Sequence, residues 1–195
     1  ILIDGLGISG LSTFKFIKDK SDIFLYDDYR SKIKSEDIKK KLVKFKNISK
    51  VKFDQIILSP CVDIRKCKLS KFLKKNYKKV HSDLDIFYSF YKNDCITITG
   101  TNGKSTTCRL IYEVLSDQKC DVKLVGNIGN PILSGKNVKK KTIFVIEASC
   151  YQLEYSKILK SKYAAILNLY PDKIERKKNL NKYEKEKIKL LKNKL

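Results

Sequence analysis

Residues 95–107 read C-I-T-I-T-G-T-N-G-K-S-T-T, and they indicate a strand, a tight loop and the start of a helix. Ile96 and Ile98 alternate with threonines, as in a buried strand. Gly100 and Gly103 permit the positive φ angles of a tight loop. Apolar residues then recur with the spacing of one helix face. The sequence therefore predicts a βα unit with a glycine loop at its joint.

This glycine loop predicts an anion-binding site. Backbone N–H groups and the positive end of the helix dipole would point at one place. Lys104 would add a charge for nucleotide phosphates, and Ser105 would offer a hydroxyl to Mg²⁺. A standard phosphate loop would need glycine where the chain has Ile98, so this loop is a shorter form. The phosphate-binding residues that we predict are Gly100, Thr101, Asn102, Gly103, Lys104, Ser105 and Thr106.

A second glycine-rich turn lies near the beginning of the chain. Residues 5–10 read G-L-G-I-S-G, between a predicted strand at 1–4 and a predicted helix. The next predicted strand, 23–26, ends at Asp27, where a Rossmann unit places its ribose-binding acid. The pattern predicts a site for a nucleotide diphosphate, and it leaves open whether the ligand is NAD.

Strands and helices alternate along the rest of the chain. Glu147 follows a predicted strand, at the edge where open α/β sheets bind ligands, so it could reach a Mg²⁺ held by the phosphate loop. The alternative is a solvated charge at a strand end. The further predicted strands are 55–59, 122–125, 142–146 and 163–169, and the predicted helices are 35–45, 66–77, 152–160 and 180–195.

This pattern predicts an α/β chain with two domains. We expect a Rossmann-like parallel-sheet domain at residues 1–92 and a truncated P-loop-type α/β ATPase domain at 93–195. The boundary falls at Asn93-Asp94, immediately before the strand that carries the phosphate loop.

The composition argues against several classes of protein. The net charge is +22, but only four of the 43 basic residues are arginine and the lysines are spread along the chain, so we expect no nucleic-acid partner. No apolar run reaches membrane-spanning length, and no signal peptide is visible. Six cysteines without C-x-x-C spacing fit reduced thiols in the cytoplasm. We expect a monomer, and because the chain lacks Met we expect a fragment of a longer protein.

Taken together, the motifs resemble those of the Mur ligase family, and within it the branch that adds D-glutamate. They follow the family's order over the whole chain. The matching segments are G-L-G-I-S-G-L-S at 5–12, L-S-P at 58–60, G-T-N-G-K-S-T at 100–106, G-N-I-G-N-P at 126–131, E-A-S-C-Y-Q-L at 147–153 and N-L-Y-P-D at 168–172.

The resemblance implies an ATP-dependent amide-bond ligase of peptidoglycan precursor synthesis. The first domain would hold the UDP part of UDP-N-acetylmuramoyl-L-alanine rather than NAD. The second would bind ATP and Mg²⁺, and a third domain, absent here, would close over D-glutamate. ATP would phosphorylate the substrate carboxylate, and the amine of D-glutamate would attack the acyl phosphate. Catalysis would consist mostly of positioning and charge neutralisation.

The resemblance also implies roles for individual residues. Lys104 would hold the phosphates, with Ser105 and Glu147 on Mg²⁺. The family has a carbamylated lysine that supports a second Mg²⁺, and Lys187, four residues after Tyr183, is its counterpart unless it is only one more solvated lysine. The uridine-diphosphate site would include Ile8, Ser9, Asp27, Asp28 and Ser59, and the muramoyl-alanine part would contact Asn127, Ser149 and Gln152.

The chain also departs from the family pattern. Lys173 replaces a histidine that binds the second metal, and an ammonium cannot ligate Mg²⁺. Cys61 and Cys150 replace a glycine and a serine. Because the chain ends before the rest of the family's central domain and the whole third domain, we expect it not to complete the ligase reaction by itself. Two alternatives stay open: a nicotinamide-dependent dehydrogenase, which rests on the first glycine turn, and a non-catalytic nucleotide-binding remnant.

Overall fold

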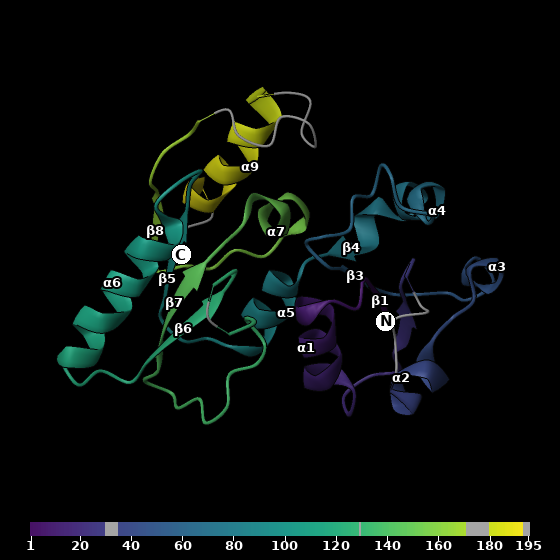
Figure 1. Cartoon of the computed structure of the whole chain (residues 1–195), viewed down its shortest axis with the longest axis horizontal. Coiled ribbons are helices and arrows are strands. Elements are labelled where there is room, and N and C mark those ends of the chain that lie inside the picture. Colours follow the sequence, from purple (N-terminus) through teal and green to yellow (C-terminus); the bar gives the residue numbers. More distant parts are fainter. Residues whose placement is uncertain (30–34, 129, 171–179, 193–195) are drawn as a thin grey trace. The chain divides into compact units, whose positions relative to one another are not determined.

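The chain forms two compact units, Ile1–Asp83 and Leu84–Leu195, each built on a parallel sheet (Figure 1). The computed structural model describes residues 1–29, 35–128, 130–170 and 180–192, without the side chains of 180–184 and 192. The division between the units precedes the boundary expected after residue 92, because helix α5 (Asp83–Phe90) packs on the second sheet. Its Phe87 ring lies 4.9 Å from the Phe144 ring, and its Tyr88 hydroxyl lies 3.0 Å from Thr97 Oγ1.

The first unit contains the predicted Rossmann-like parallel sheet. Its strand order is β2-β1-β3-β4, so the order reverses between β1 and β3 and leaves a crevice at the carboxyl ends of these strands. The strands are β1 (Leu2–Asp4), β2 (Phe24–Tyr26), β3 (Ile56–Leu58) and β4 (Val80–His81), and the helices are α1 (Ile8–Ile17), α2 (Glu36–Lys41), α3 (Phe45–Ile48), α4 (Ser70–Lys75) and the 3₁₀ turn η2 (Tyr77–Lys79).

Two helices of the first unit are shorter than predicted. The helix expected over 35–45 ends at Lys41, because Leu42 and Val43 run beside β2 and the Val43 N–H donates to Leu25 O at 2.9 Å. The helix expected over 66–77 begins only at Ser70. Asp63 holds the preceding residues in a turn, since its backbone carbonyl accepts from the N–H groups of residues 66 and 67.

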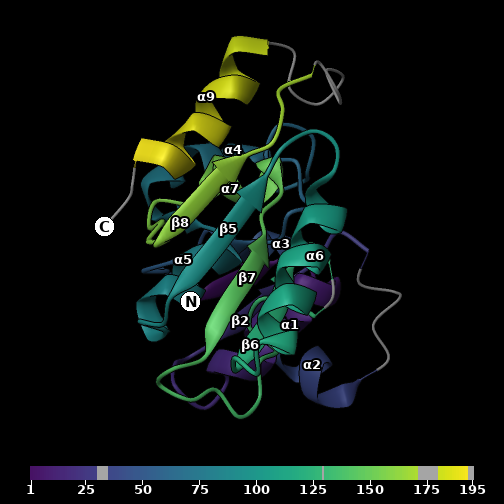
Figure 2. The same cartoon turned by 90° about the vertical axis from the view of Figure 1, so that its left-hand side faces the viewer.

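The second unit is a four-stranded parallel sheet in the order β6-β7-β5-β8. Helix α6 covers one face of this sheet, and α5 and α7 cover the other (Figures 1 and 2). Ile98, Cys108 and Val145 are buried between the sheet and α6. The strands are β5 (Cys95–Thr99), β6 (Val122–Gly126), β7 (Ile143–Glu147) and β8 (Tyr163–Ile166), and the remaining helices are α6 (Lys104–Asp117), α7 (Cys150–Tyr155) and α9 (Leu180–Lys192).

Helix α7 was predicted over 152–160 but spans Cys150–Tyr155, so it begins two residues earlier and ends five residues earlier than predicted. It ends at Tyr155 because Asp85, which is buried, holds the chain that follows. Asp85 Oδ1 accepts from Ser156 Oγ at 2.7 Å and from the N–H groups of Lys157 and Ile158 at 2.8 Å. None of the helices that the structure describes is long and apolar enough to cross a bilayer.

Candidate functional site

The predicted phosphate loop joins β5 to α6 at the carboxyl end of the second sheet. Gly103 has a left-handed φ of 78° and is the residue before the first turn of α6. Glycine adopts this conformation without strain. The first N–H groups of a helix have no acceptor within the helix, so this turn presents several donors together. The sequence prediction of strand, loop and helix is confirmed here.

Glu147 connects the loop to the two strands beside it. It is the last residue of β7 and is only 1% exposed. Its Oε2 accepts from Ser105 Oγ at 2.8 Å, and its Oε1 accepts from Asn127 Nδ2 at 2.9 Å. This burial excludes the alternative of a solvated strand-end charge. The structure therefore brings together Ser105, Asn127 and Glu147, three residues that the sequence analysis chose separately.

Two lysines bind Thr101 in the loop. Lys104 Nζ donates to Thr101 O at 2.6 Å, and Lys187 Nζ donates to Thr101 Oγ1 at 3.3 Å. Lys187 belongs to α9 and is fully buried, so it is not one more solvated lysine. The ammonium group of Lys104, in the first turn of α6, makes this end of the sheet suited to an anion.

Asn168 is a site residue to which the sequence analysis gave no role. It lies two residues after β8 and bonds to the loop: its Oδ1 accepts from Thr101 N at 3.0 Å and from Asn102 N at 2.9 Å, and its Nδ2 donates to Asn102 O at 3.1 Å. The strand predicted over 163–169 ends at Ile166, so Asn168, predicted within the strand, lies just past its carboxyl end. A polar residue near the carboxyl end of that predicted strand was the available signal.

Cys108 lies in α6 behind the loop and is fully buried. Burial and, to a smaller extent, the Glu147 charge raise the pKa of its thiol to about 12 against the opposing effect of the Lys104 charge. The thiol is therefore protonated at neutral pH and is no nucleophile.

The oxygen ligands of the site fit Mg²⁺ better than a softer metal. Mg²⁺ in phosphate-binding sites usually takes one or two protein oxygens and completes its shell with phosphates and water. The Ser105 hydroxyl and the Glu147 carboxylate, 2.8 Å apart, supply such a pair. Among the residues that the structure describes, no three His, Cys, Asp or Glu side chains form a larger metal cluster. Lys173 and the Tyr183 side chain lie outside the described residues.

In the first unit, the predicted UDP-binding residues surround the glycine turn. Asp27 accepts from Leu6 N at 2.6 Å and from Tyr29 N at 2.7 Å, and Ser59 Oγ donates to Gly5 O at 2.6 Å. Asp27 and Ser59 therefore hold the turn in place.

The other predicted residues of this turn differ in exposure and bonding. Asp28 accepts from Tyr26 Oη at 2.9 Å and from Lys68 N at 3.1 Å. Ile8 is 78% exposed, whereas Ser9 beside it is half-buried.

Asp4 is a second residue that the sequence analysis did not single out. It ends β1, is 3% exposed, and its Oδ2 has no hydrogen-bond partner among the described residues. Burial and, to a smaller extent, the nearby Asp28 and Asp27 charges together raise the pKa of Asp4 to about 8. Asp4 therefore carries a proton at neutral pH.

Ser149 and Gln152, predicted to contact substrate, form a capping box at the start of α7. The Gln152 N–H donates to Ser149 Oγ at 3.2 Å, and Gln152 Oε1 accepts from Ser149 N at 3.1 Å. Gln152 is 2% exposed. The S-x-x-Q spacing was a signal for this structural role.

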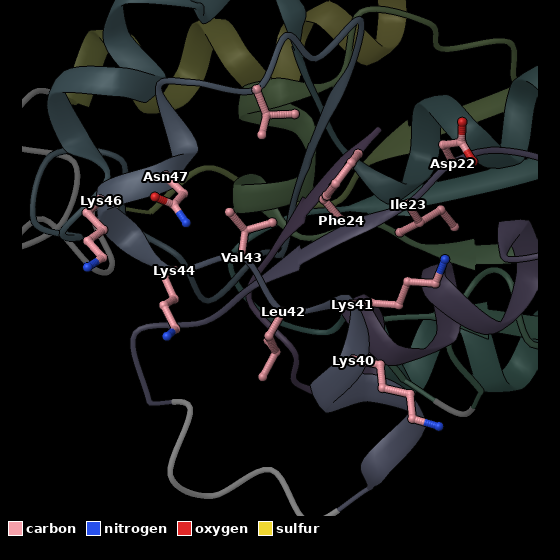
Figure 3. A pocket seen from close by; sticks show the side chains of 11 residues that line it. Asp22, Ile23, Phe24, Lys40, Lys41, Leu42, Val43, Lys44, Lys46 and Asn47 are labelled. Atoms are coloured by element: carbon pink, nitrogen blue, oxygen red, sulfur yellow. The ribbon is translucent and has the colours of Figure 1, made fainter.

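A cavity of about 600 Å³ lies in the first unit, away from the glycine turn (Figure 3). Its lining includes the residues that lead into β2, so it lies at the amino end of that strand, whereas open α/β sheets bind ligands at the carboxyl ends. No residue predicted for a site lines it. The lining residues are Asp22, Ile23, Phe24, Lys40, Lys41, Leu42, Val43, Lys44, Lys46, Asn47 and Val51.

Comparison with known families and sequences gives consistent matches. Residues 98–195 match the Mur ligase middle domain. The chain is 34% identical over 190 residues to UDP-N-acetylmuramoylalanine--D-glutamate ligase of Rickettsia bellii, covering 95% of this chain and 42% of the relative. It is 34% identical over 204 residues to the protein of that name from Caldicellulosiruptor bescii, covering 99% and 44%. The chain thus spans less than half the length of these relatives.

Solved structures share the fold at low sequence identity. The UDP-N-acetylmuramate:L-alanyl-gamma-D-glutamyl-meso-diaminopimelate ligase from Neisseria meningitides aligns with a TM-score of 0.60 at 15% identity, over all of this chain and 68% of that one. The UDP-N-acetylmuramate-alanine ligase from Thermotoga maritima aligns with a TM-score of 0.53 at 17% identity, over 99% of this chain and 47% of that one.

Proposed function

The chain belongs to the Mur ligase family, and from that membership we propose that it carries the UDP-substrate and ATP-binding parts of a ligase that joins D-glutamate to UDP-N-acetylmuramoyl-L-alanine. The observation that carries the proposal is the Ser105–Glu147 pair beside the phosphate loop. The names of the relatives supply the substrates. Family membership leaves the dehydrogenase alternative without support.

In this proposal the second unit positions ATP. The phosphates lie over the start of α6, where Lys104 moves from Thr101 O to the anion and neutralises charge. Ser105 and Glu147 would hold Mg²⁺, which would supply further charge neutralisation on the phosphates. The γ-phosphoryl group passes to the substrate carboxylate and ADP leaves. The amine of D-glutamate then attacks the acyl carbon, loses a proton and displaces phosphate.

The first unit, within the proposed 1–92 domain, would bind the UDP part of the substrate. Ile8 is exposed and Ser9 is half-buried at the glycine turn, so both can contact the diphosphate region. Asp27, Asp28 and Ser59 would fix the shape of that site, because each is bonded to the turn or to its surroundings.

The proposed 93–195 domain would contact the muramoyl-alanine part through Asn127, Ser149 and Gln152. Lys187 is proposed as the counterpart of the family's carbamylated lysine, because it is fully buried beside the loop. Intact-mass measurement with and without bicarbonate tests that modification. An unchanged mass in bicarbonate would contradict it.

We further propose a cytoplasmic monomer that does not turn over by itself. Light scattering tests the monomer, and an assay of D-glutamate-dependent ADP release tests the lack of turnover. ADP release that requires both D-glutamate and the UDP substrate would contradict the second statement.

A thermal-shift panel tests the proposed function. The chain is compared alone and with UDP-N-acetylmuramoyl-L-alanine, Mg-ATP or NAD(H) at equal concentrations. A ligand at a hundred times its Kd adds about 2.7 kcal/mol to the free energy of unfolding, which gives a measurable shift in Tm. We expect the UDP substrate to raise Tm and NAD(H) not to. A shift with NAD(H) and none with the UDP substrate would refute the proposal.

A further inference from the structure

The side-chain amide of Asn168 spans the first half of the phosphate loop. Its Oδ1 accepts from Thr101 N and Asn102 N, and its Nδ2 donates to Asn102 O, at distances of 2.9–3.1 Å. An asparagine amide has four hydrogen-bonding positions, so three of them bind loop backbone. The Thr101 N–H also donates to the backbone carbonyl of Asn168 at 3.3 Å, whereas the Asn102 N–H donates to the Asn168 side chain.

Tyr170 adds backbone contacts to the same half of the loop. Thr101 Oγ1 donates to Tyr170 O at 3.1 Å and accepts from Tyr170 N at 3.0 Å. Thr101 is 7% exposed. The segment after β8 therefore fixes residues 101 and 102, while residues 103–106 begin α6 and their N–H groups have no acceptor within the helix.

We propose that Asn168 is a positioning residue for nucleotide binding. It engages the N–H groups of Thr101 and Asn102, so that the phosphates of ATP meet the N–H groups of residues 103–106. The inference rests on the proposed ATP-binding function and adds to it which half of the loop receives the anion. A loop held in one conformation binds without the entropic cost of ordering it.

The test compares Asn168→Ala with Asn93→Ala in the full chain. Asn93 is a control in the same unit whose side-chain amide also makes three hydrogen bonds to the backbone. Its Nδ2 donates to the carbonyls of residues 139, 140 and 142, and it precedes β5 at the opposite end of the strand from the loop. Urea unfolding should show that both variants lose stability. Calorimetry with Mg-ATP should show an affinity about tenfold to a hundredfold lower for Asn168→Ala and within about twofold of the unmodified chain for Asn93→Ala.

Amide hydrogen exchange without nucleotide gives a second, independent result. Asn168→Ala should speed exchange at Asn102, whereas Asn168→Asp, which keeps the acceptor oxygen, should leave it slow. With Mg-ATP, exchange should slow at residues 103–106 and stay unchanged at Asn102.

Several results would overturn the inference. The first is that Asn168→Ala binds Mg-ATP as tightly as the unmodified chain. The second is that Asn93→Ala loses as much affinity for Mg-ATP as Asn168→Ala does. The third is that Asn168→Ala leaves amide hydrogen exchange at Asn102 unchanged. Failure of the proposed function looks different: the unmodified chain would then not bind Mg-ATP, while Asn102 would still depend on Asn168 for protection.

Discussion

Glu147 is a single buried carboxylate that joins three segments of the second unit. Its two oxygens accept from Ser105 on α6 and from Asn127 after β6, and Glu147 itself ends β7. Burying a charge without such bonds would cost several kcal/mol. Both donors are neutral and leave the carboxylate oxygens available as ligands for a cation.

The first prediction concerns that charge. Glu147→Gln keeps the shape of the side chain and removes its charge, so we expect Mg-ATP affinity to fall by about tenfold or more while the chain stays folded. Glu113→Gln on α6 is the control in the same unit, because Glu113 is exposed and its ion pair with Arg109 contributes at most about 1 kcal/mol. Calorimetry with and without Mg²⁺ measures both variants. A Glu147→Gln chain with unchanged Mg²⁺-dependent affinity would contradict the assignment.

Asp4 predicts an unusual dependence of stability on pH. The pKa of Asp4 is about 8 in the folded chain, above the 3.8 that is ordinary for an aspartate, so the folded state binds one more proton between these pH values. The free energy of unfolding should therefore fall as pH rises from about 4 to 8, by at most about 1.4 kcal/mol per pH unit from this group. Asp4→Asn should lose this slope and be the more stable protein above pH 8.

Urea unfolding at pH values from 5 to 9, spaced ~1 pH unit apart, measures how the free energy of unfolding depends on Asp4. Asp19→Asn, a substitution of an exposed aspartate in the same unit, should keep the slope of the unmodified chain. If the free energy of unfolding depends on pH in the same way in Asp4→Asn and Asp19→Asn, the carboxyl of Asp4 is not the origin of the slope.

At the scale of single elements, the glycine turn after β1 depends on close contact of backbone with backbone. A Cβ on Gly10 would collide with Gly5 O and lie 2.8 Å from Ser59 Oγ, whereas a Cβ on Gly7 would meet no atom within 4 Å. Packing therefore requires glycine at position 10, whereas position 7 tolerates a side chain.

Gly10→Ala should destabilise the first unit by about 1–3 kcal/mol or more, as overpacking does in other cores. It should also abolish the shift in Tm caused by the UDP substrate. Gly7→Ala should change stability by less than about 0.5 kcal/mol, as most surface substitutions do. Equal urea midpoints for the two variants would disprove the contact between α1 and the turn.

The sequence predicted the elements better than their ends. Alternating apolar residues and glycine loops are local signals, so both parallel sheets and both glycine turns could be foreseen. The helices ended early where a distant residue took over their backbone groups, as Leu25 does for Val43 and Asp85 does for residues after α7. Such competition between tertiary bonds and helix propensity has no local signature.

The same reasoning explains which parts of the candidate site were missed. Lys104, Ser105 and Glu147 lie in recognisable motifs at strand ends, so they could be chosen in advance. The bonds of Asn168 to the loop join residues 66 or 67 positions apart, and the pairing of Ser149 with Gln152 follows a capping pattern that was open to another interpretation. Only the sheet order brings β8 beside β5 and shows what Asn168 binds.

At the scale of the whole molecule, the net charge of +22 predicts sensitivity to salt. Like charges repel in the compact state, and salt screens them over about 10 Å at 0.1 M. Raising NaCl from about 10 mM to about 300 mM should therefore raise Tm. Sucrose at equal osmolality controls for effects that do not involve charge. A Tm that falls or stays constant with NaCl would show that self-repulsion is not a main destabilising term.

The extended segment at Leu42–Val43 also bears on how the chain behaves at high concentration. It lies along β2, the outer strand of its sheet, and lysines at 40, 41 and 44 flank it. An uncovered outer strand offers unpaired backbone groups on which another chain can add, and this is a route to aggregation. Lysines beside such a strand oppose that addition. The interruption of the predicted helix therefore also protects the first sheet against growth into fibrils.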